Sequence, residues 1–167
     1  MKKVTLFYFL VLLFSAVAFQ ACDQEEPKPV PKSYTITSII LQDYPPFSPD
    51  GDDWDPVTGF NRYPDCFLTL YNSAAVPPTL PRITDTKENV SVSHSFGLSN
   101  YYTIDNLGAT WILRLYDEDQ LGDEYMGEIS FVLNDNMNYI NNGETLNSVL
   151  YFKQGQMDVI IYGIWNF

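Results

Sequence analysis

The chain has 167 residues, of which 21 are Asp or Glu and 9 are Lys or Arg, so its formal net charge at pH 7 is −12. Such an acidic surface repels nucleic-acid phosphates, and no run of Lys or Arg offers a phosphate-binding patch. We therefore expect no nucleic-acid partner.

Residues 1–21 have the pattern of a targeting segment that takes no part in the fold. Lys2 and Lys3 form a basic start, and an apolar run interrupted by one Thr and one Ser follows over Val4–Ala18. This run is shorter than the roughly 20 apolar residues that a stable transmembrane helix needs.

Cys22 directly follows Phe19-Gln20-Ala21 at the end of the apolar run. A cysteine placed after a small residue in this way resembles the lipobox of bacterial lipoproteins, in which a signal peptidase cuts before a Cys that carries lipid. The resemblance implies that residues 1–21 are a lipoprotein signal peptide and that the N-terminal lipid on Cys22 attaches the chain to a membrane. The other readings are an ordinary secretory signal and a short membrane anchor.

Residues 22–33 are predicted to form an acidic, proline-rich tether. Alternating prolines at Pro27, Pro29 and Pro31 favour an extended spacer without a core of its own. The acids that follow Cys22 resemble the surface-export signals of some Gram-negative lipoproteins. That resemblance implies an outer-membrane lipoprotein exposed at the cell surface, whereas the alternative is that the acids only solubilise the tether.

Residues 34–167 are enough chain for one domain, and their pattern predicts an all-β fold. Short apolar and aromatic runs are separated by turns that carry Pro, Gly, Asn and Asp, and no segment shows convincing helical periodicity. We expect an eight-stranded antiparallel β-sandwich. The eight strand candidates are Tyr34–Leu41, Cys66–Tyr71, Val90–Phe96, Tyr101–Ile104, Ala109–Tyr116, Met126–Leu133, Leu146–Phe152 and Met157–Trp165.

Two features of these strands give expectations that a structure can check. Alternation along Trp111–Tyr116 predicts that Leu113 is buried and Arg114 exposed. Cys66 is left without a cysteine partner once Cys22 is lipidated, so we expect no intrachain disulfide. In an apolar strand, Cys66 is most simply a small buried residue.

Acidic residues are concentrated in two separate turns. Like charges this close repel one another unless water or a cation screens them, and calcium binds six to eight oxygens in flexible geometry. The alternative is an acidic surface turn whose charge only maintains solubility. The acids are Asp43, Asp50, Asp52, Asp53 and Asp55 in the first turn, with Asp65 at its end, and Asp117, Glu118, Asp119, Asp123 and Glu124 in the second.

The order of these pieces resembles a C2 domain, the calcium-dependent lipid-binding β-sandwich, from about Tyr34 to Phe167. A long first loop ends in an Asp at the mouth of a strand, within Pro64–Leu70. A later strand leads into a D-x-D loop, Asp117-Glu118-Asp119, followed by an acid and the Gly-bearing Met126–Glu128. Gly155–Tyr162 matches the Gly-started amphipathic strand that typically closes the family fold.

The resemblance implies a calcium site shared by the two acidic turns. Loops at one end of a sandwich converge, so acids distant in sequence can share one cavity. The second turn is slightly short, which leaves open whether Asp123 or Glu124 takes the third position. The family's basic patch for anionic headgroups has no counterpart. The expected ligands are Asp55, Asp65, Asp117, Asp119 and one of Asp123 or Glu124.

Two kinds of function follow from these features. The first is a calcium-binding module that docks to a membrane or to a protein partner, with Phe47, Trp54 and Leu121 inserting beside the acids. The opposing reading for Phe47 and Trp54 is that they fold back over the long loop. The second is a metal-free interaction module of a cell-surface complex that binds protein or glycan.

We expect no catalytic activity. The sequence shows no nucleophile elbow, no His-rich zinc site and no Gly-rich phosphate loop. A glycoside hydrolase using paired carboxylates is the remaining enzymatic reading, and it is the least supported one.

Overall fold

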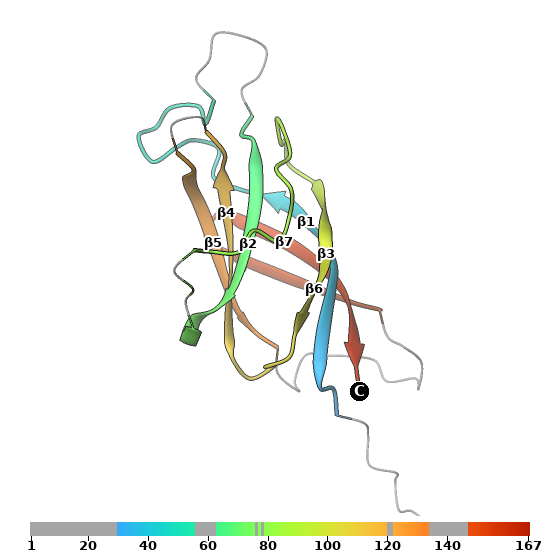
Figure 1. The fold of residues 1–167 in the computed structure, drawn as a ribbon. Coiled ribbons are helices and arrows are strands. Elements are labelled where there is room, and N and C mark those ends of the chain that lie inside the picture. Colours follow the sequence, from blue (N-terminus) through green and yellow to red (C-terminus); the bar gives the residue numbers. More distant parts are fainter. Residues whose placement is uncertain (1–29, 56–62, 76, 78, 120–121, 134–146) are drawn as a thin grey trace, which may run out of the picture. The chain divides into compact units, whose positions relative to one another are not determined.

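Alternating apolar and polar residues form seven strands in the part of the chain that the structure describes (Figure 1). The structure is a computed structural model that describes residues 30–55, 63–75, 77, 79–119, 122–133 and 147–167. Chain contacts separate Met1–Val30 from Pro31–Phe167, and all the described strands lie in the second unit. The strands are β1 (Ser33–Asp43), β2 (Cys66–Asn72), β3 (His94–Ile104), β4 (Thr110–Asp117), β5 (Glu124–Val132), β6 (Asn147–Gln154) and β7 (Met157–Asn166).

The strands form two antiparallel sheets that enclose an apolar core. One sheet has four strands in the order β3-β1-β7-β6, and the other has three in the order β2-β4-β5. Side chains that alternate inward from both sheets fill the space between them. The antiparallel β-sandwich is therefore confirmed. Fully buried members of the core include Tyr34, Ile36, Ile39, Leu41, Leu68, Leu70, Leu113, Leu115, Val159 and Ile161.

The eight strand candidates correspond to seven strands because Val90–Phe96 and Tyr101–Ile104 meet within β3. The register of β3 on β1 jumps from Tyr102 to Gly97, so the residues between them form an irregular bulge. The polar residues around Gly97 therefore mark a bulge within one strand instead of a turn between two.

An extended segment beside β2 connects the edges of the two sheets. It contacts β2 and β3 through single β-bridges and forms no continuous ladder. This segment carries Arg82 close to the turn that follows β4, which matters for the acidic site. The bridges are Cys66–Lys87, Thr69–Arg82 and Thr84–Leu98.

The two side-chain predictions are confirmed. Leu113 is fully buried, whereas Arg114 on the opposite face is partly exposed and donates to Glu128 on β5 at 2.8 Å. Arg114 and Glu128 are direct partners in the register of β4 on β5. Cys66 is a buried free cysteine.

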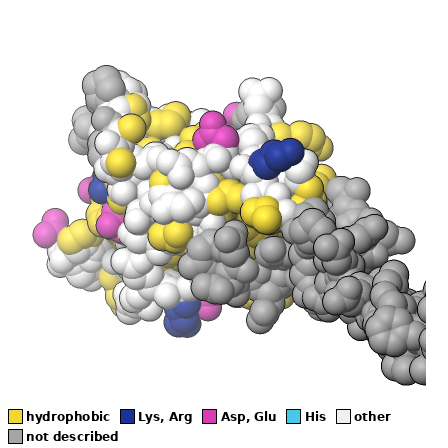
Figure 2. Space-filling view, turned by 90° about the horizontal axis from the view of Figure 1, so that it is seen from below, with side chains coloured by type: hydrophobic (Ala, Val, Ile, Leu, Met, Phe, Trp, Pro, Cys, Tyr) yellow, Lys and Arg dark blue, Asp and Glu magenta, His cyan; other side chains and the backbone are white. Residues whose placement is uncertain are grey.

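Hydrophobic side chains are not confined to the core. Figure 2 shows them interspersed with acidic and basic side chains on one face of the molecule. Phe47, Tyr101 and Tyr151 are among the exposed large hydrophobic residues. Scattered surface hydrophobic residues are normal in soluble domains and by themselves indicate no site.

The N-terminal predictions fall on residues whose structure is not described. These are the signal peptide, the lipidation site Cys22 and most of the tether. In the described part of the chain, no helix has the length and apolar character needed to cross a membrane.

Candidate metal site

Strand pairing brings the two acidic turns together at one end of the three-stranded sheet. Asp117 is the last residue of β4 and pairs with Cys66, the first residue of β2. Asp65 therefore lies beside Asp117, and its backbone N–H donates to Asp117 Oδ1 at 2.7 Å. The next residue completes the link, since the Glu118 N–H donates to the Asp65 carbonyl at 2.8 Å.

Three of the predicted ligands form a cluster of carboxylates. Asp55, Asp117 and Asp119 each offer one carboxylate oxygen, and these oxygens lie within 4.8 Å of one another. They come from two turns more than 60 residues apart in sequence, as the convergence of loops predicted. Asp65 lies next to the cluster, where its Oδ1 accepts the backbone N–H of Asn89 at 2.8 Å.

Asp117 is the electrostatic centre of this cluster. Its side chain is 0% exposed, and its Oδ2 has no hydrogen-bond partner among the described residues. Burial raises the pKa of Asp117 to about 7, and the charges of Asp55, Asp119 and Asp65 act in the same direction. The N–H of Asp65 opposes this rise in pKa by stabilising the ionised form.

The pKa of Asp55, which lies in the first acidic turn, is also raised by its surroundings. Burial raises its pKa, and the charges of Asp65 and Asp119 raise it further. The calcium-free arrangement is therefore unfavourable for charged carboxylates, and a cation bound among them would reverse that effect.

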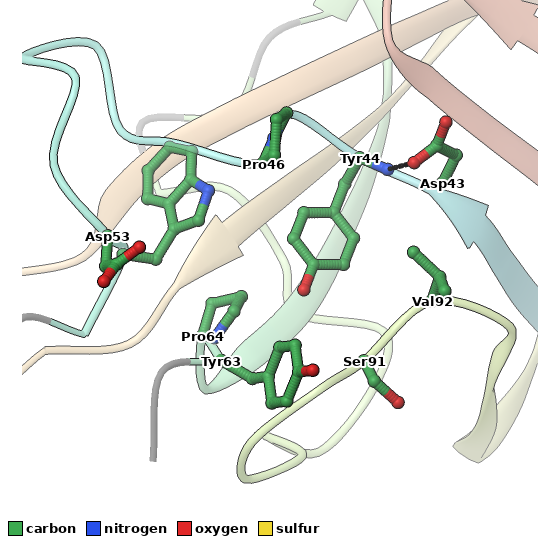
Figure 3. A pocket seen from close by; sticks show the side chains of 9 residues that line it. Asp43, Tyr44, Pro46, Asp53, Tyr63, Pro64, Ser91 and Val92 are labelled. Atoms are coloured by element: carbon green, nitrogen blue, oxygen red, sulfur yellow. Dashed lines mark hydrogen bonds between the residues drawn. The ribbon is translucent and has the colours of Figure 1, made fainter. Parts of the chain in front are cut away.

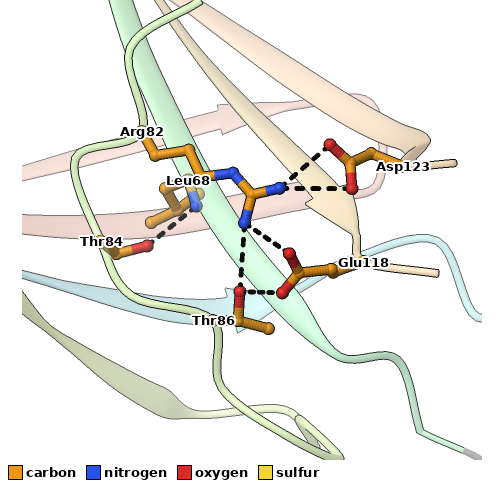
Figure 4. A network of polar contacts seen from close by, with 6 residues as sticks. All are labelled: Leu68, Arg82, Thr84, Thr86, Glu118 and Asp123. Carbon is orange, nitrogen blue, oxygen red and sulfur yellow. Dashed lines mark hydrogen bonds and ion pairs between the residues drawn. The ribbon is translucent and has the colours of Figure 1, made fainter. Parts of the chain in front are cut away.

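Arg82 binds two further acids of the second turn, Glu118 and Asp123 (Figure 4). Its guanidinium group donates to Glu118 Oε1 at 2.7 Å and to Asp123 Oδ2 at 3.1 Å. Thr86 also donates to Glu118, and these hydrogen bonds lower the pKa of Glu118. The same guanidinium group lies over the Phe67 ring, 3.6 Å from its centroid.

The third acid expected from the second turn is thus absent from the described cluster. Asp123 pairs with Arg82, and Glu124 is an exposed residue at the start of β5. The spacing of the acids in the sequence does not decide between Asp123 and Glu124, and it does not indicate that Arg82 pairs with Asp123. Arg82 lies in a Pro- and Thr-containing connection, so its partners are defined only by the tertiary fold.

The apolar residues predicted beside the acids differ in their exposure. Trp54 is only 4% exposed, and its Nε1 donates to the Pro45 carbonyl at 2.7 Å. Its ring folds back over the long loop, so Trp54 does not present itself for insertion into a membrane. Phe47 is 54% exposed, and Leu121 lies outside the described residues.

The cluster has the donor chemistry of a hard-cation site. Its side-chain ligands are all carboxylates, which suit calcium, magnesium or manganese better than soft metals. Calcium tolerates the irregular geometry of loop ligands, whereas magnesium demands near-octahedral geometry. The residues present therefore fit calcium.

No family model and no curated protein matches the chain. Among solved structures, a C2 domain of plant extended synaptotagmin 1 is 13% identical with a TM-score of 0.47, over 83% of this chain and 95% of that one. A C2 domain protein from Ramazzottius varieornatus is 13% identical with a TM-score of 0.46, over 81% of this chain and 89% of that one.

Human GIVD cytosolic phospholipase A2 is 14% identical to this chain with a TM-score of 0.43. The match covers 81% of this chain and 18% of the phospholipase, so this chain spans less than a fifth of that enzyme. The C2 domains among these structures belong to the family that the sequence motifs resemble. Likeness at this identity concerns the fold, so the ligand has to be inferred from the residues of this chain.

Proposed function

We propose that this protein is a lipid-anchored, C2-like module that binds calcium and then docks to a membrane or a protein partner. The observation that carries the proposal is the buried Asp117, whose Oδ2 has no partner in the described structure and whose carboxylate groups with those of Asp55 and Asp119 within 4.8 Å. A buried acceptor without a partner is costly, and a divalent cation would satisfy it together with its neighbours.

Calcium is the ion that fits the surroundings of the site best. Extracellular calcium modules commonly have dissociation constants of about 10⁻⁴ to 10⁻³ M, which suits a site with three clustered carboxylates. Asp65 adds negative potential from beside the cluster, while its Oδ1 accepts the backbone N–H of Asn89. Asp123 is not proposed as a ligand, because Arg82 binds it.

Docking is proposed to follow from the change in charge. An acidic protein repels anionic surfaces, and calcium reduces that repulsion at the end of the sandwich where the two turns meet. Phe47, which is exposed on the long loop, is proposed to contact the membrane or partner. The lipid on Cys22 is proposed to hold the protein at the outer membrane of a Gram-negative cell, in a role without catalysis.

Calorimetric titration of the full chain in detergent tests the calcium site. We expect saturable binding and a rise in melting temperature with calcium relative to chelator, because a ligand that binds only the folded state stabilises it. The double variant Asp117→Asn with Asp119→Asn should lose most of the binding, since calcium affinity depends on the number of charged ligands.

The matched control is Asp50→Asn with Asp52→Asn, which removes the same charge from exposed positions on the long loop. It should bind calcium nearly as well as the unmodified protein. Absence of binding in the unmodified protein, or equal losses in both double variants, would contradict the site. The metal-free interaction module would then be the better account.

A further inference from the structure

A cavity lies where the long loop meets the segment before β3 (Figure 3). Its volume is about 450 Å³, within the range of roughly 300–1,000 Å³ that is usual for ligand pockets. None of the three clustered carboxylates of the proposed calcium site lines it. The lining residues are Asp43, Tyr44, Pro46, Asp53, Trp54, Tyr63, Pro64, Ser91 and Val92.

The inner part of this pocket is apolar, and the hydrogen-bond donors of its two buried aromatic side chains already bind backbone carbonyls. Tyr44 and Trp54 are both buried. The Tyr44 hydroxyl donates to the Val90 carbonyl at 2.6 Å, and Trp54 Nε1 donates to the Pro45 carbonyl at 2.7 Å. These two rings therefore offer a ligand their carbon surfaces and leave it no donor.

The outer part of the pocket is acidic and aromatic. Asp43 and Asp53 are exposed and lie on opposite sides of the Tyr44 and Tyr63 rings (Figure 3). Asp43 Oδ1 accepts the Tyr44 N–H at 3.0 Å, but neither carboxylate forms a salt bridge within the described part of the chain. Tyr63 is 51% exposed, so its ring is accessible from solvent.

We propose that this pocket binds the side chain of a Lys or Arg presented by a protein partner. The apolar stem of such a side chain would pack on the ring and proline surfaces, and its cation would lie near Tyr63 and one of the two carboxylates. Ionised carboxylates only accept hydrogen bonds, so they match the N–H groups of ammonium and guanidinium.

Two other ligand classes fit the lining less well. A quaternary ammonium headgroup has no N–H to give to Asp43 or Asp53. A sugar requires several donors as well as acceptors, and the donors of Tyr44 and Trp54 are engaged within the protein, which leaves the hydroxyls of Tyr63 and Ser91 among the described lining side chains. Among the residues that the structure describes, the lining contains no Lys or Arg that would repel a basic side chain.

The test uses the full chain in detergent, labelled with ¹⁵N-tryptophan. The protein has 3 Trp residues, and the variant Trp54→Phe assigns the indole signal of Trp54. The probes are acetyl-arginine amide and acetyl-lysine amide, compared with uncharged acetyl-norleucine amide, methyl glucoside and phosphatidylcholine bicelles. We expect saturable shifts of the Trp54 signal with the two cationic probes only.

Two matched double variants separate this pocket from the calcium site. Asp43→Asn with Asp53→Asn should weaken binding of acetyl-arginine amide by up to about fivefold, because the exposed ion pair is lost whichever of the two carboxylates forms it. Asn at position 43 keeps the oxygen that accepts the Tyr44 N–H. Asp117→Asn with Asp119→Asn should leave this binding within about twofold of the unmodified protein, whatever it does to calcium.

Three results would overturn the proposal. The first is the absence of a saturable Trp54 shift with either cationic probe. The second is an equal shift with norleucine amide, glucoside or phosphatidylcholine, which would assign the pocket to apolar, glycan or lipid ligands. The third is weaker arginine binding in the Asp117 and Asp119 variant alone, which would place the cation among the clustered carboxylates.

Discussion

A buried carboxylate without a full set of partners is rare, because burial penalises its charged form. In this protein Asp117 is held in that position by the backbone at the end of β4 and by the N–H of Asp65. Oδ2 has no hydrogen-bond partner among the described residues, and the carboxylate groups with those of Asp55 and Asp119. The fold therefore maintains a local charge repulsion that a bound cation would relieve.

Replacing Asp117 alone tests this account at the scale of one residue. Asp117→Asn keeps the oxygen that accepts the Asp65 N–H and turns the second oxygen into a donor for the neighbouring carboxylates. We expect the calcium-free protein to gain roughly 1–3 kcal/mol of stability, which is the usual cost of an unsatisfied buried polar group. Urea unfolding in chelator measures the gain.

Asp50→Asn removes an exposed carboxylate from the long loop and should leave the unfolding free energy nearly unchanged. If Asp117→Asn were neutral or destabilising in chelator, the calcium-free carboxylate would not be under strain from its neighbours.

The positions of individual acidic residues were predictable where a strand fixes them. Asp117 ends β4, and Asp65 immediately precedes β2, so alternation and spacing located both. Spacing does not distinguish Asp123 from Glu124, because the choice depends on Arg82, which is 41 residues from Asp123 in sequence. The sequence allows Trp54 either to insert into a membrane or partner or to fold back over the long loop. Only the hydrogen bond to Pro45 distinguishes these two alternatives.

The extended segment that carries Arg82 shapes the second acidic turn. It lies beside β2 through the bridge of Thr69 to Arg82, and the Leu68 N–H donates to Thr84 Oγ1 at 2.9 Å. From this position Arg82 draws Glu118 and Asp123 together (Figure 4). Glu118 and Asp123 are thus paired with a cation of the protein itself, whereas Asp117 and Asp119 belong to the carboxylate cluster.

Arg82→Ala should destabilise the protein by about 1–2 kcal/mol. The two ion pairs are about 40% exposed, so each contributes up to about 1 kcal/mol, and stacking on Phe67 adds a similar amount at most. Urea unfolding at low and high salt measures the loss, and salt should shrink its ionic part.

Lys87→Ala is the matched control, because it removes one positive charge from the same segment without breaking a salt bridge among the described residues. Equal losses in both variants would mean that net charge, and not the contacts of Arg82, determines the effect.

The elements themselves were predictable wherever alternation is regular. Along β4, inward Leu113 and outward Arg114 follow directly from the two-residue period of a strand. The sequence pattern divides β3 in two because Gly97 and the polar residues after it resemble a turn. A bulge uses the same residue types, and only pairing with β1 shows that the strand continues.

At the scale of the whole molecule, the proposed membrane anchor and the proposed calcium site are far apart along the sequence. The proposed anchor is Cys22, whereas the acidic cluster is built from residues 55 to 119. A lipid anchor keeps the domain at a high local concentration near the membrane, so even a weak calcium-dependent contact becomes effective.

Cys22→Ala tests the anchor. The variant should incorporate no labelled fatty acid and should leave the membrane fraction, because the proposed thioether-linked lipid supplies the attachment. Metabolic labelling followed by membrane pelleting measures both effects. Cys66→Ala is the matched control, since it removes the other of the 2 cysteines, which is buried in the core, and should keep the label. A Cys22→Ala protein that still carries label and pellets with membranes would show that the attachment lies elsewhere in the chain.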